Sequence, residues 1–260
     1  MQLTIIKIGG NIIDDTNKLE SFLRSFAAID GYKILVHGGG KIASDIGTKL
    51  GISPNYIDGR RITDEPTLRL VTMVYGGLIN KNIVASLQTY GCNAIGLTGA
   101  DGNTIAAVKR PVTTIDYGFA GDVTSDGVNS DLIGKLLNIG LTPVFAPLTY
   151  SHTSDILNTN ADTIAQELAK AMAASMTVKL IYCFEKKGVL RNGDDDNSVI
   201  PVITNDMFLS LKNQGIISGG MIPKLQNAFE AISKGVDQVV IGHAEELTEL
   251  MTANAGTLIR

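Results

Sequence analysis

Two lysines beside double-glycine segments are the residues in this chain best suited to chemistry. The segments read Lys7-Ile8-Gly9-Gly10, His37-Gly38-Gly39-Gly40 and Gly219-Gly220-Met221-Ile222-Pro223-Lys224. Because glycine has no Cβ, its backbone N–H group can approach a bulky anion closely. Consecutive N–H groups at a strand-to-helix turn form an anion-binding concavity, helped by the helix N-terminus. The first two segments each follow a short apolar run, and together with the lysines they predict a site that holds a phosphoryl group from both ends.

Both lysines stand where a cation is unfavourable unless it has a partner or a function. Lys7 belongs to the apolar run at residues 3–8, and a lysine in a strand covered on both faces is costly to bury unpaired. The alternative for Lys7 is a strand-edge side chain that reaches solvent. Lys224 falls in the first turn of a predicted helix, where the helix dipole disfavours a cation. We therefore favour a functional role for both lysines.

Three further polar positions have weaker signals. Asn158-Thr159-Asn160-Ala161-Asp162 opens a predicted helix, and its polar residues suit a routine first turn as well as a functional site. His37 is predicted to be a structural hydrogen-bonding residue rather than a catalyst. Asp194-Asp195-Asp196 lacks the remaining spacing of an EF-hand, which indicates a solvated hairpin tip.

Composition narrows the class of protein. The chain has 260 residues, of which 44% are hydrophobic and 18% charged, as expected for a globular protein with a sizeable core. The net charge is −4 without a dense basic patch, which argues against a nucleic-acid partner. Neither a P-loop nor a Gly-x-Gly-x-x-Gly fingerprint occurs, so a nucleotide would be bound by another device.

The remaining composition points to a cytoplasmic protein without a metal site. Cys92 and Cys183 each lie in an apolar run and are predicted to be buried thiols. The chain has three histidines, which are few ligands for zinc. We expect no membrane partner, because no apolar stretch approaches the ~18–20 residues that a span needs. The N-terminus also enters a strand without a basic leader segment.

Strand and helix signals alternate along the chain, which indicates βαβ units and an α/β fold with a mostly parallel central sheet. Expected strands cover residues 3–8, 33–36, 93–97, 105–108, 142–146, 177–183, 189–191, 238–241 and 257–259, with β segments within 112–123. Expected helices include residues 19–26, 42–50, 130–138, 160–173, 205–213, 221–234 and 244–251. Residues 53–63 read as a hairpin or irregular excursion, and turns are expected at Asp101-Gly102 and Asp126-Gly127.

A long helical pattern starts at Asp64, with Pro66 in the first turn, and continues to about Thr89. Gly76-Gly77 lies inside it, which leaves open a kinked helix, two helices, or one helix packed closely on another element. We expect one continuous sheet with two lobes that meet near residues 173–176. In such sheets ligands bind beyond the carboxyl ends of the strands.

Taken together, five segments resemble the acetylglutamate kinase branch of the amino-acid kinase family. They are Ile6-Lys7-Ile8-Gly9-Gly10, Val36-His37-Gly38-Gly39-Gly40, Gly59-Arg60-Arg61-Ile62-Thr63, Asn158-Thr159-Asn160-Ala161-Asp162 and Gly219-Gly220-Met221-Ile222-Pro223-Lys224. The resemblance implies a three-layer αβα sandwich forming a single domain of residues 1–260. Its N-lobe, residues 1–174, would bind the acyl-amino-acid and dimerise, and its C-lobe, residues 175–260, would bind the nucleotide.

The resemblance also implies an activity: phosphoryl transfer from ATP to the side-chain carboxylate of an N-acylated glutamate, the second step of arginine biosynthesis. Lys7 and Lys224 would stabilise the phosphoryl group in transit, and Asp162 would orient both lysines. The backbone N–H groups of Gly10 and Gly39 would complete the cradle. The residues implied to hold the acyl-amino-acid are Gly39, Gly40, Arg61 and Asn158.

The nucleotide would lie over the second lobe, with Mg²⁺ held mainly by the ATP phosphates rather than by a protein site. Its implied contacts are Lys7, Gly9, Glu185, Lys186, Lys187, Gly188, Val189, Leu190, Ile216, Ile217, Ser218 and Lys224. The sequence departs from the family here: Phe184-Glu185-Lys186-Lys187-Gly188 replaces the usual Ser/Thr-Asp-Val-x-Gly loop.

Several alternatives stay open at this point. The chain starts directly at its first strand, without the N-terminal helix of arginine-inhibited hexameric relatives, which suggests a homodimer without arginine feedback. The acyl group could be acetyl or a larger group such as succinyl. One rival is another kinase of this fold, acting on a different carboxylate, a carbamate or a phosphate. The other is a catalytically silent amino-acid-binding regulatory module.

Overall fold

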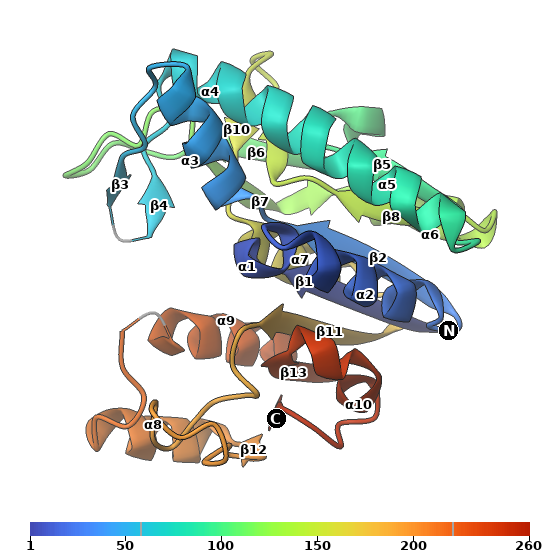
Figure 1. The fold of residues 1–260 in the computed structure, drawn as a ribbon, viewed down its shortest axis with the longest axis vertical. Helices are drawn as coiled ribbons and strands as arrows, with labels where there is room; N and C mark the ends of the chain where they lie inside the picture. Colours follow the sequence, from blue (N-terminus) through green and yellow to red (C-terminus); the bar gives the residue numbers. More distant parts are fainter. Residues whose placement is uncertain (58, 220) are drawn as a thin grey trace.

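The computed structural model describes residues 1–57, 59–219 and 221–260, and an eight-stranded sheet runs through the centre of this part (Figure 1). The strand order is β12 (Val202–Ile203), β14 (Thr257–Ile259), β13 (Gln238–His243), β11 (Thr177–Phe184), β1 (Gln2–Ile8), β2 (Tyr32–His37), β8 (Thr142–Phe145) and β5 (Ala94–Leu97). Neighbouring strands are parallel except β13 with β14. The loops after β1, β2, β8 and β11 therefore meet at one edge of the sheet.

Helices cover both faces of this sheet, which confirms the predicted three-layer αβα sandwich. One face carries α6 (Ser130–Asn138), α7 (Ala161–Met172), α8 (Asn205–Asn213) and α9 (Met221–Ser233). The other carries α1 (Gly10–Ile13), α2 (Thr16–Ala27), α3 (Gly40–Lys49), α4 (Glu65–Val71), η1 (Thr72–Ile79), α5 (Asn80–Thr89), η3 (Ala244–Glu246) and α10 (Leu247–Met251).

Alternation along the strands divides the apolar residues between two cores. In β1, Leu3 and Ile5 pack on the α7 side, whereas Ile6 and Ile8 pack on the α2 side. All four side chains are fully buried, and each contributes roughly 1.5–3 kcal/mol relative to an exposed position. Lys7 has the parity of Leu3 and Ile5, so its side chain leaves the sheet on the side of α7.

A second, four-stranded sheet corrects the prediction of one continuous sheet. Its order is β10 (Ile156–Asn158), β9 (Leu148–Tyr150), β6 (Ile105–Lys109) and β7 (Gly121–Val128). The predicted turn at Asp126-Gly127 was wrong, because both residues belong to β7, whose register with β6 shifts at this end. The expected turn at Asp101-Gly102 is confirmed as η2 (Asp101–Asn103), with Gly102 at φ 59°.

Some short elements differ from the sequence-based expectation. The hairpin predicted within residues 53–63 is present as β3 (Tyr56–Ile57) and β4 (Arg60–Arg61), whereas β9, β10 and β12 were not predicted. The strand expected at residues 189–191 is reduced to an isolated bridge between Leu190 and Val199. Within residues 112–123 only the end belongs to a strand, β7.

The predicted long helix is continuous from Glu65 to Thr89, and its middle third is the π-helix η1. Asp64 caps it by accepting a hydrogen bond from the Thr67 N–H at 3.0 Å. Gly76 lies inside η1, where an added Cβ would come within 3.3 Å of Leu148. Of the three alternatives for this segment, the structure therefore shows one helix packed closely on another element.

By length and composition alone, the same Glu65–Thr89 helix could cross a membrane, with a mean hydropathy of 1.2 in its most apolar window. The expectation that no stretch approaches that length needs this correction. However, 44% of the most apolar segment of this helix is buried inside the protein. Core helices of soluble proteins can have the same length and composition. This is weak evidence for a membrane span.

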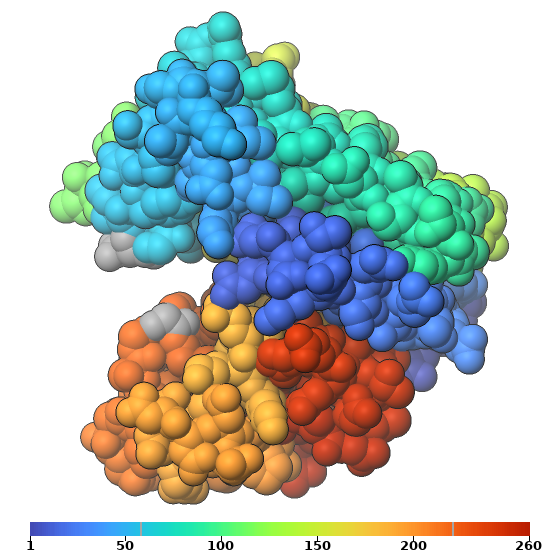
Figure 2. Space-filling model, viewed as in Figure 1, coloured from blue at the N-terminus to red at the C-terminus, as the bar shows by residue number. Residues whose placement is uncertain are grey.

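Figure 2 shows that the molecular surface is hollowed between two parts of the chain. In Figure 1 these parts lie above and below strand β1. The upper part carries α3, α4 and the β3–β4 hairpin, and the lower part carries α8 and α9. The chain passes from α7 to β11 across residues 173–176. The assignment of an N-lobe and a C-lobe with separate binding tasks stays a prediction. Cys92 and Cys183 are free and buried, as predicted.

Candidate active site

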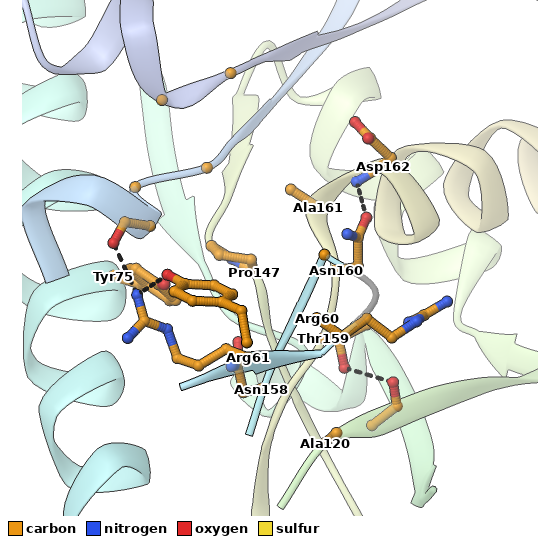
Figure 3. Close-up of a pocket in the computed structure, with 18 of the residues that line it drawn as sticks. Arg60, Arg61, Tyr75, Ala120, Pro147, Asn158, Thr159, Asn160, Ala161 and Asp162 are labelled. Carbon is orange, nitrogen blue, oxygen red and sulfur yellow. Dashed lines mark hydrogen bonds between the residues drawn. The ribbon is translucent and has the colours of Figure 1, made fainter. Parts of the chain in front are cut away.

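A cavity of about 210 Å³ opens at the carboxyl edge of the main sheet (Figure 3). Residues from the loops after β1 and β2, from β4, and from the start of α7 form its wall. The lining residues are Lys7, Gly9, Gly10, Gly38, Gly39, Gly40, Tyr56, Gly59, Arg60, Arg61, Tyr75, Ala120, Gly121, Pro147, Asn158, Thr159, Asn160, Ala161 and Asp162. The structure therefore brings together residues from all four of the motifs that lie within residues 1–174.

Lys7 and Asp162 form an ion pair in this cavity, with Nζ and Oδ1 2.6 Å apart. Asp162 stands in the first turn of α7, and the Asn160 side chain caps that helix by accepting from the N–H groups of Asp162 and Thr163. Burial raises the pKa of Asp162, but the charges of Lys7 and Lys224 outweigh it and hold this pKa below its usual value. The carboxylate is thus ionised and placed under the influence of both lysines.

Lys224 approaches the site from the other part of the molecule, in the first turn of α9. Its Nζ lies 4.6 Å from the centroid of the Phe184 ring, a cation–π contact made at the end of β11. Burial lowers the pKa of Lys224, Asp162 opposes this shift, and Lys7 adds to it. Within the described part of the chain, the structure records no carboxylate at ion-pair distance from Lys224. Gly220, which precedes α9 in the sequence, lies outside the described residues.

The two N-lobe glycine loops place backbone N–H groups at the cavity. Gly10 begins α1, directly after β1, and Gly40 begins α3, directly after β2. Gly39 has φ 145°, a conformation open to glycine but strained for other residues. An added Cβ at Gly39 would lie 2.3 Å from Cδ1 of Ile79, so glycine is required by contact as well as by backbone geometry.

Arg61 is fixed against the start of α3. Its Nη2 donates hydrogen bonds to the Gly40 carbonyl at 2.8 Å and to Ser44 Oγ at 2.9 Å, and also to the Tyr56 hydroxyl. The guanidinium carbon lies 4.6 Å from the Tyr56 ring centroid. Because these bonds use Nη2, the fork of the guanidinium keeps other N–H groups for a carboxylate.

Asn158, at the end of β10, lines the same cavity as Arg61. Its Nδ2 donates to Thr63 Oγ1 at 3.0 Å, which orients the amide and leaves Oδ1 as an acceptor. Tyr75 stands beside this pair on η1 and is almost fully buried (Figure 3). Burial raises the pKa of Tyr75 to about 12, so its hydroxyl stays protonated.

The lining side chains that were not predicted as site residues include Tyr56, Arg60 and Tyr75. Arg60 and Arg61 extend in opposite directions from β4, as neighbouring strand residues do (Figure 3). Burial lowers the pKa of Arg60, the charge of Arg110 lowers it further, and Asp122 opposes both. The position of Arg60 next to Arg61 was a signal that could have found it. Tyr56 and Tyr75 come from separate segments, and nothing in their spacing marks them.

Of the predicted nucleotide residues, Lys7 and Gly9 line this cavity. The others lie near the end of β11 and around the start of α9, outside its lining. Val189 and Ile217 are 2% exposed and Leu190 is 9% exposed, so their side chains belong to the hydrophobic core. Glu185, Lys186 and Lys187 are exposed, and Lys186 pairs with Asp196 at 3.1 Å. Gly188 is buried beside Thr257. No comparison tests these contacts, and they stay predictions.

The parallel sheet, and the cavity at its edge lined by a paired lysine and two glycine loops, fit one class of protein. Residues 2–243 match the amino acid kinase family, and the chain belongs to that family. Its curated relatives narrow the placement to the acetylglutamate kinase branch. The chain is 56% identical over 259 residues to an acetylglutamate kinase from Phocaeicola vulgatus, covering 100% of this chain and 98% of that protein.

A more distant relative carries the same name. An acetylglutamate kinase from Methanopyrus kandleri is 37% identical over 262 residues, with coverage of 99% of this chain and 100% of that protein. Among solved structures, smu.665 from Streptococcus mutans superposes with a TM-score of 0.76 at 29% identity, covering 99% of this chain and 98% of that one.

A second solved structure is a fold relative alone. N-acetylglutamate synthase from Neisseria gonorrhoeae, complexed with coenzyme A and N-acetyl-glutamate, has a TM-score of 0.82 at 22% identity. The match covers 99% of this chain and 59% of that chain. It supports the predicted amino-acid kinase fold and nothing about activity.

Proposed function

We propose that this chain is an ATP-dependent kinase that converts N-acetyl-L-glutamate to N-acetylglutamyl 5-phosphate, the second step of arginine biosynthesis. The observation that carries the proposal is the Lys7–Asp162 ion pair, 2.6 Å long, set between two glycine loops in a cavity that also holds Arg61. Sequence identity of 56% to an enzyme named acetylglutamate kinase supports the choice of substrate.

The chemistry needs positioning and charge compensation rather than a general base. A γ-carboxylate is already ionised at neutral pH, so its oxygen can attack the γ-phosphorus directly. The new C–O–P bond forms as the bond to the β,γ-bridging oxygen breaks, and ADP leaves. Lys7 and Lys224 offset the charge that gathers on the transferred group, with Asp162 between them as the orienting carboxylate. The N–H groups of Gly10 and Gly39 supply fixed donors.

Arg61 and Asn158 are placed to hold the acyl-amino-acid. We assign the guanidinium of Arg61 to the α-carboxylate, because a planar fork matches that group. The Oδ1 atom of Asn158 is placed to accept the amide N–H of the acylated nitrogen. The backbone of Gly39 and Gly40 closes the same pocket.

The nucleotide is proposed to lie over β11 and α9, near the exposed Glu185–Lys187 turn, with Lys224 facing its phosphates. Mg²⁺ accompanies the ATP phosphates and helps to neutralise them. The donor set fits a metal held mainly by the nucleotide: among the described lining residues Asp162 is the one carboxylate, and Lys7 engages it. No group of three metal-ligating side chains occurs in the described ranges.

We also propose that the enzyme works in the cytoplasm as a homodimer through the α4–η1–α5 helix. This helix exposes apolar side chains in its middle, with Met73 60% exposed and Leu78 47% exposed. The cytoplasm is where ATP and free amino acids are available together. The two reduced, buried cysteines are consistent with that compartment.

A second acyl group, succinyl, is favoured by one observation. Arg60 lines the cavity, and the described residues provide it with no hydrogen bond or ion pair. A half-buried guanidinium to which the described residues give no hydrogen bond or ion pair suits a ligand that carries an additional carboxylate. N-succinyl-L-glutamate has that group and N-acetyl-L-glutamate lacks it.

One substrate panel tests these proposals. ADP release is measured with N-acetyl-L-glutamate, N-succinyl-L-glutamate, L-glutamate, L-aspartate and UMP as acceptors. We expect turnover with an N-acylated glutamate, and the preferred acyl group decides between acetyl and succinyl. ADP release with only another acceptor would instead assign a different kinase of this fold. Ligand binding by calorimetry without turnover would assign the silent regulatory module.

Lysine variants test the mechanism on the preferred substrate. Lys7→Ala and Lys224→Ala are each expected to lower kcat about 10²–10³-fold, as for loss of a transition-state donor. Lys135→Ala is the matched control, because Lys135 is exposed and forms an ion pair with Asp131 on α6, away from the cavity lining. Folded variants that retain near-normal turnover at saturating substrate would show that the proposed mechanism is wrong.

A further inference from the structure

A buried polar network lies directly behind the second glycine loop. His37, the last residue of β2, is fully buried, and Asn80, the first residue of α5, is 1% exposed. The Nδ1 atom of His37 lies 2.7 Å from the Gly38 carbonyl oxygen. Its Nε2 atom lies 3.1 Å from Asn80 Nδ2. Burying a polar group this deeply costs free energy unless the group is hydrogen-bonded. Each polar atom of this network is therefore expected to have a hydrogen-bond partner.

The partners of Asn80 determine which way its amide faces. Asn80 Nδ2 lies 2.9 Å from the carbonyl oxygen of Val144, which can only accept. Asn80 Oδ1 lies 3.2 Å from Lys81 Nζ, which can only donate. Lys81 Nζ also donates to the Gly96 carbonyl at 3.0 Å. Two independent contacts therefore assign Nδ2 as the atom that faces His37.

This orientation of Asn80 determines the tautomer of His37. Because Asn80 Nδ2 is a donor, His37 Nε2 must be the unprotonated acceptor, and the proton lies on Nδ1. The Nδ1–H group then donates to the Gly38 carbonyl. Burial lowers the pKa of His37 to about 4, the hydrogen bond to Gly38 opposes this, and the charge of Lys81 adds to it. The ring is neutral at neutral pH.

The hydrogen bond to the Gly38 carbonyl has a consequence for the next N–H group. No cis peptide occurs in the described chain, and in a trans peptide the C=O and N–H groups point in opposite directions. With its carbonyl held toward His37, the Gly38–Gly39 peptide directs the Gly39 N–H away from the core, on the side of the cavity. The Gly38 N–H is also held, donating to the Ile8 carbonyl at 3.1 Å.

The long helix and two glycines fix the position of Asn80 in this network. Asn80 follows η1 directly, so the π-helical segment sets where its side chain falls. A Cβ at Gly96 would lie 1.9 Å from Asn80 Oδ1, and a Cβ at Gly39 would lie 2.3 Å from Ile79 Cδ1. Gly96 thus makes room for Asn80, and Gly39 makes room for the preceding residue of the same helix, Ile79.

We propose that His37 and Asn80 are positioning residues of the phosphoryl-transfer site, which act through the Gly38 carbonyl to aim the Gly39 N–H at the reacting group. This inference rests on the proposed function, since it gives the Gly39 N–H its ligand. His37 itself touches no substrate and transfers no proton. Its role is to hold one peptide plane at the angle that the oxyanion needs.

The tautomer can be measured without any substrate. In protein labelled with ¹⁵N-histidine, the ring nitrogens of His37, His152 and His243 give separate signals, and loss of one set in His37→Asn assigns His37. We expect the Nδ1–H tautomer, unchanged from pH 8 to about pH 5 because the pKa is about 4. An Nε2–H tautomer, or a doubly protonated ring at neutral pH, would overturn the network. This measurement of the tautomer does not depend on whether the protein has kinase activity.

Two substitutions then test the positioning role by kinetics. In His37→Asn the side-chain amide reaches the place of Nδ1 and can still donate to Gly38, whereas in His37→Gln it reaches the place of Nε2 and cannot. We expect His37→Gln to lower kcat/KM for the acyl-amino-acid about tenfold with KM for ATP within about twofold, and His37→Asn to restore most of the loss. His152→Gln, at an exposed position outside the cavity, is the control and should leave both constants unchanged.

A purely structural His37 predicts a different pattern. Both variants would then lose thermal stability to a similar degree while the folded fraction kept normal kinetic constants. Equal loss of kcat/KM in His37→Asn and His37→Gln would also refute the role of the Gly38 carbonyl. If His37→Gln does not fold, Asn80→Asp provides the second reading: it removes the donor to Nε2 and is expected to raise the His37 pKa in the same ¹⁵N spectra.

Discussion

At the scale of single residues, the site depends on one carboxylate shared by two lysines. Lys7 contacts Asp162 directly, whereas Lys224 influences its charge from the other side of the cleft. The sequence predicted both lysines because each occupies a position where a cation is unfavourable. Residue spacing alone could not rank Asp162 above an ordinary first-turn residue, because the ion pair joins β1 to α7 across more than 150 positions of sequence. Asp162 was predicted only through the family resemblance.

Asp162→Asn should therefore damage both stability and catalysis. The substitution keeps the shape but leaves the largely buried Lys7 ammonium without its anion, at a cost of about 1–3 kcal/mol in the free energy of unfolding. Loss of the orienting charge should lower kcat by roughly 10²-fold. Urea unfolding and ADP release measure the two effects.

The pH dependence of unfolding provides the internal check for Asp162. Its pKa in the folded protein is depressed, so the ion pair stabilises the fold above the unfolded pKa. That stabilisation is lost only as pH falls through the depressed value, below about pH 4. The difference in free energy of unfolding between wild type and Asp162→Asn should thus be constant near neutrality and become smaller in acid. A difference that grows in acid would contradict the assigned charge.

Phe184 is a residue-scale departure from the family with a testable role. Its ring faces Lys224 Nζ at 4.6 Å, and a cation–π contact contributes roughly 0.5–2 kcal/mol depending on solvent exposure. Phe184→Leu keeps an apolar side chain but removes the ring face, so we expect kcat to fall about two- to fivefold with little change in KM for the acyl-amino-acid. Phe184→Tyr keeps the face and should stay close to wild type. Equal effects of Leu and Tyr would rule out the cation–π contact as the cause.

At the scale of elements, periodicity predicted the long elements well and failed for the short ones. The helices α2, α6 and α7 and the central strands have apolar patterns long enough to recognise. Strands β9, β10 and β12 have two or three residues, which is too short for any period to show. Asp126-Gly127 is typical of a turn but lies in β7, because tertiary pairing with β6 overrides local preference.

The π-helix η1 is the element that was least predictable from the sequence. Gly76-Gly77 indicated an irregularity inside the long helix, but not that η1 would carry Tyr75 into the cavity wall and Ile79 against Gly39. Such contacts depend on how one helix docks on two loops, which spacing alone does not encode. The candidate site was therefore predicted in its glycine and lysine residues and missed in its aromatic ones.

Gly39→Ala tests the fit between this helix and the glycine loop. The substitution combines a strained φ of 145° with a contact of 2.3 Å to Ile79 Cδ1. Gly31→Ala is the matched control, since Gly31 has φ 80° and no atom within 4 Å of an added Cβ. We expect Gly31→Ala to lower the free energy of unfolding by about 1 kcal/mol and Gly39→Ala by about 1–3 kcal/mol more. Equal losses in thermal unfolding would mean that the Ile79 contact is unimportant.

At the scale of the whole molecule, the α4–η1–α5 helix joins the candidate site to the proposed dimer face. Its inner side holds Tyr75, Ile79 and Asn80 against the glycine loop, while Met73 and Leu78 point outward from the same few turns. A two-fold dimer through this helix would bury those apolar residues against their own copies. It would also restrain the segment that positions Gly39, so assembly and activity should change together.

Met73→Glu/Leu78→Glu tests that coupling. Each introduced carboxylate would be desolvated at the interface and would face its symmetry copy, so the pair should shift the protein from a dimer to the 27.6 kDa monomer at micromolar concentration. Ile139→Glu is the matched control, because Ile139 is 71% exposed and lies away from this helix. Light scattering after gel filtration measures the mass, circular dichroism checks the fold, and ADP release should fall only in the monomeric variant. A monomeric wild type would show that the proposed dimer does not form. Dissociation caused by Ile139→Glu instead would place the interface elsewhere.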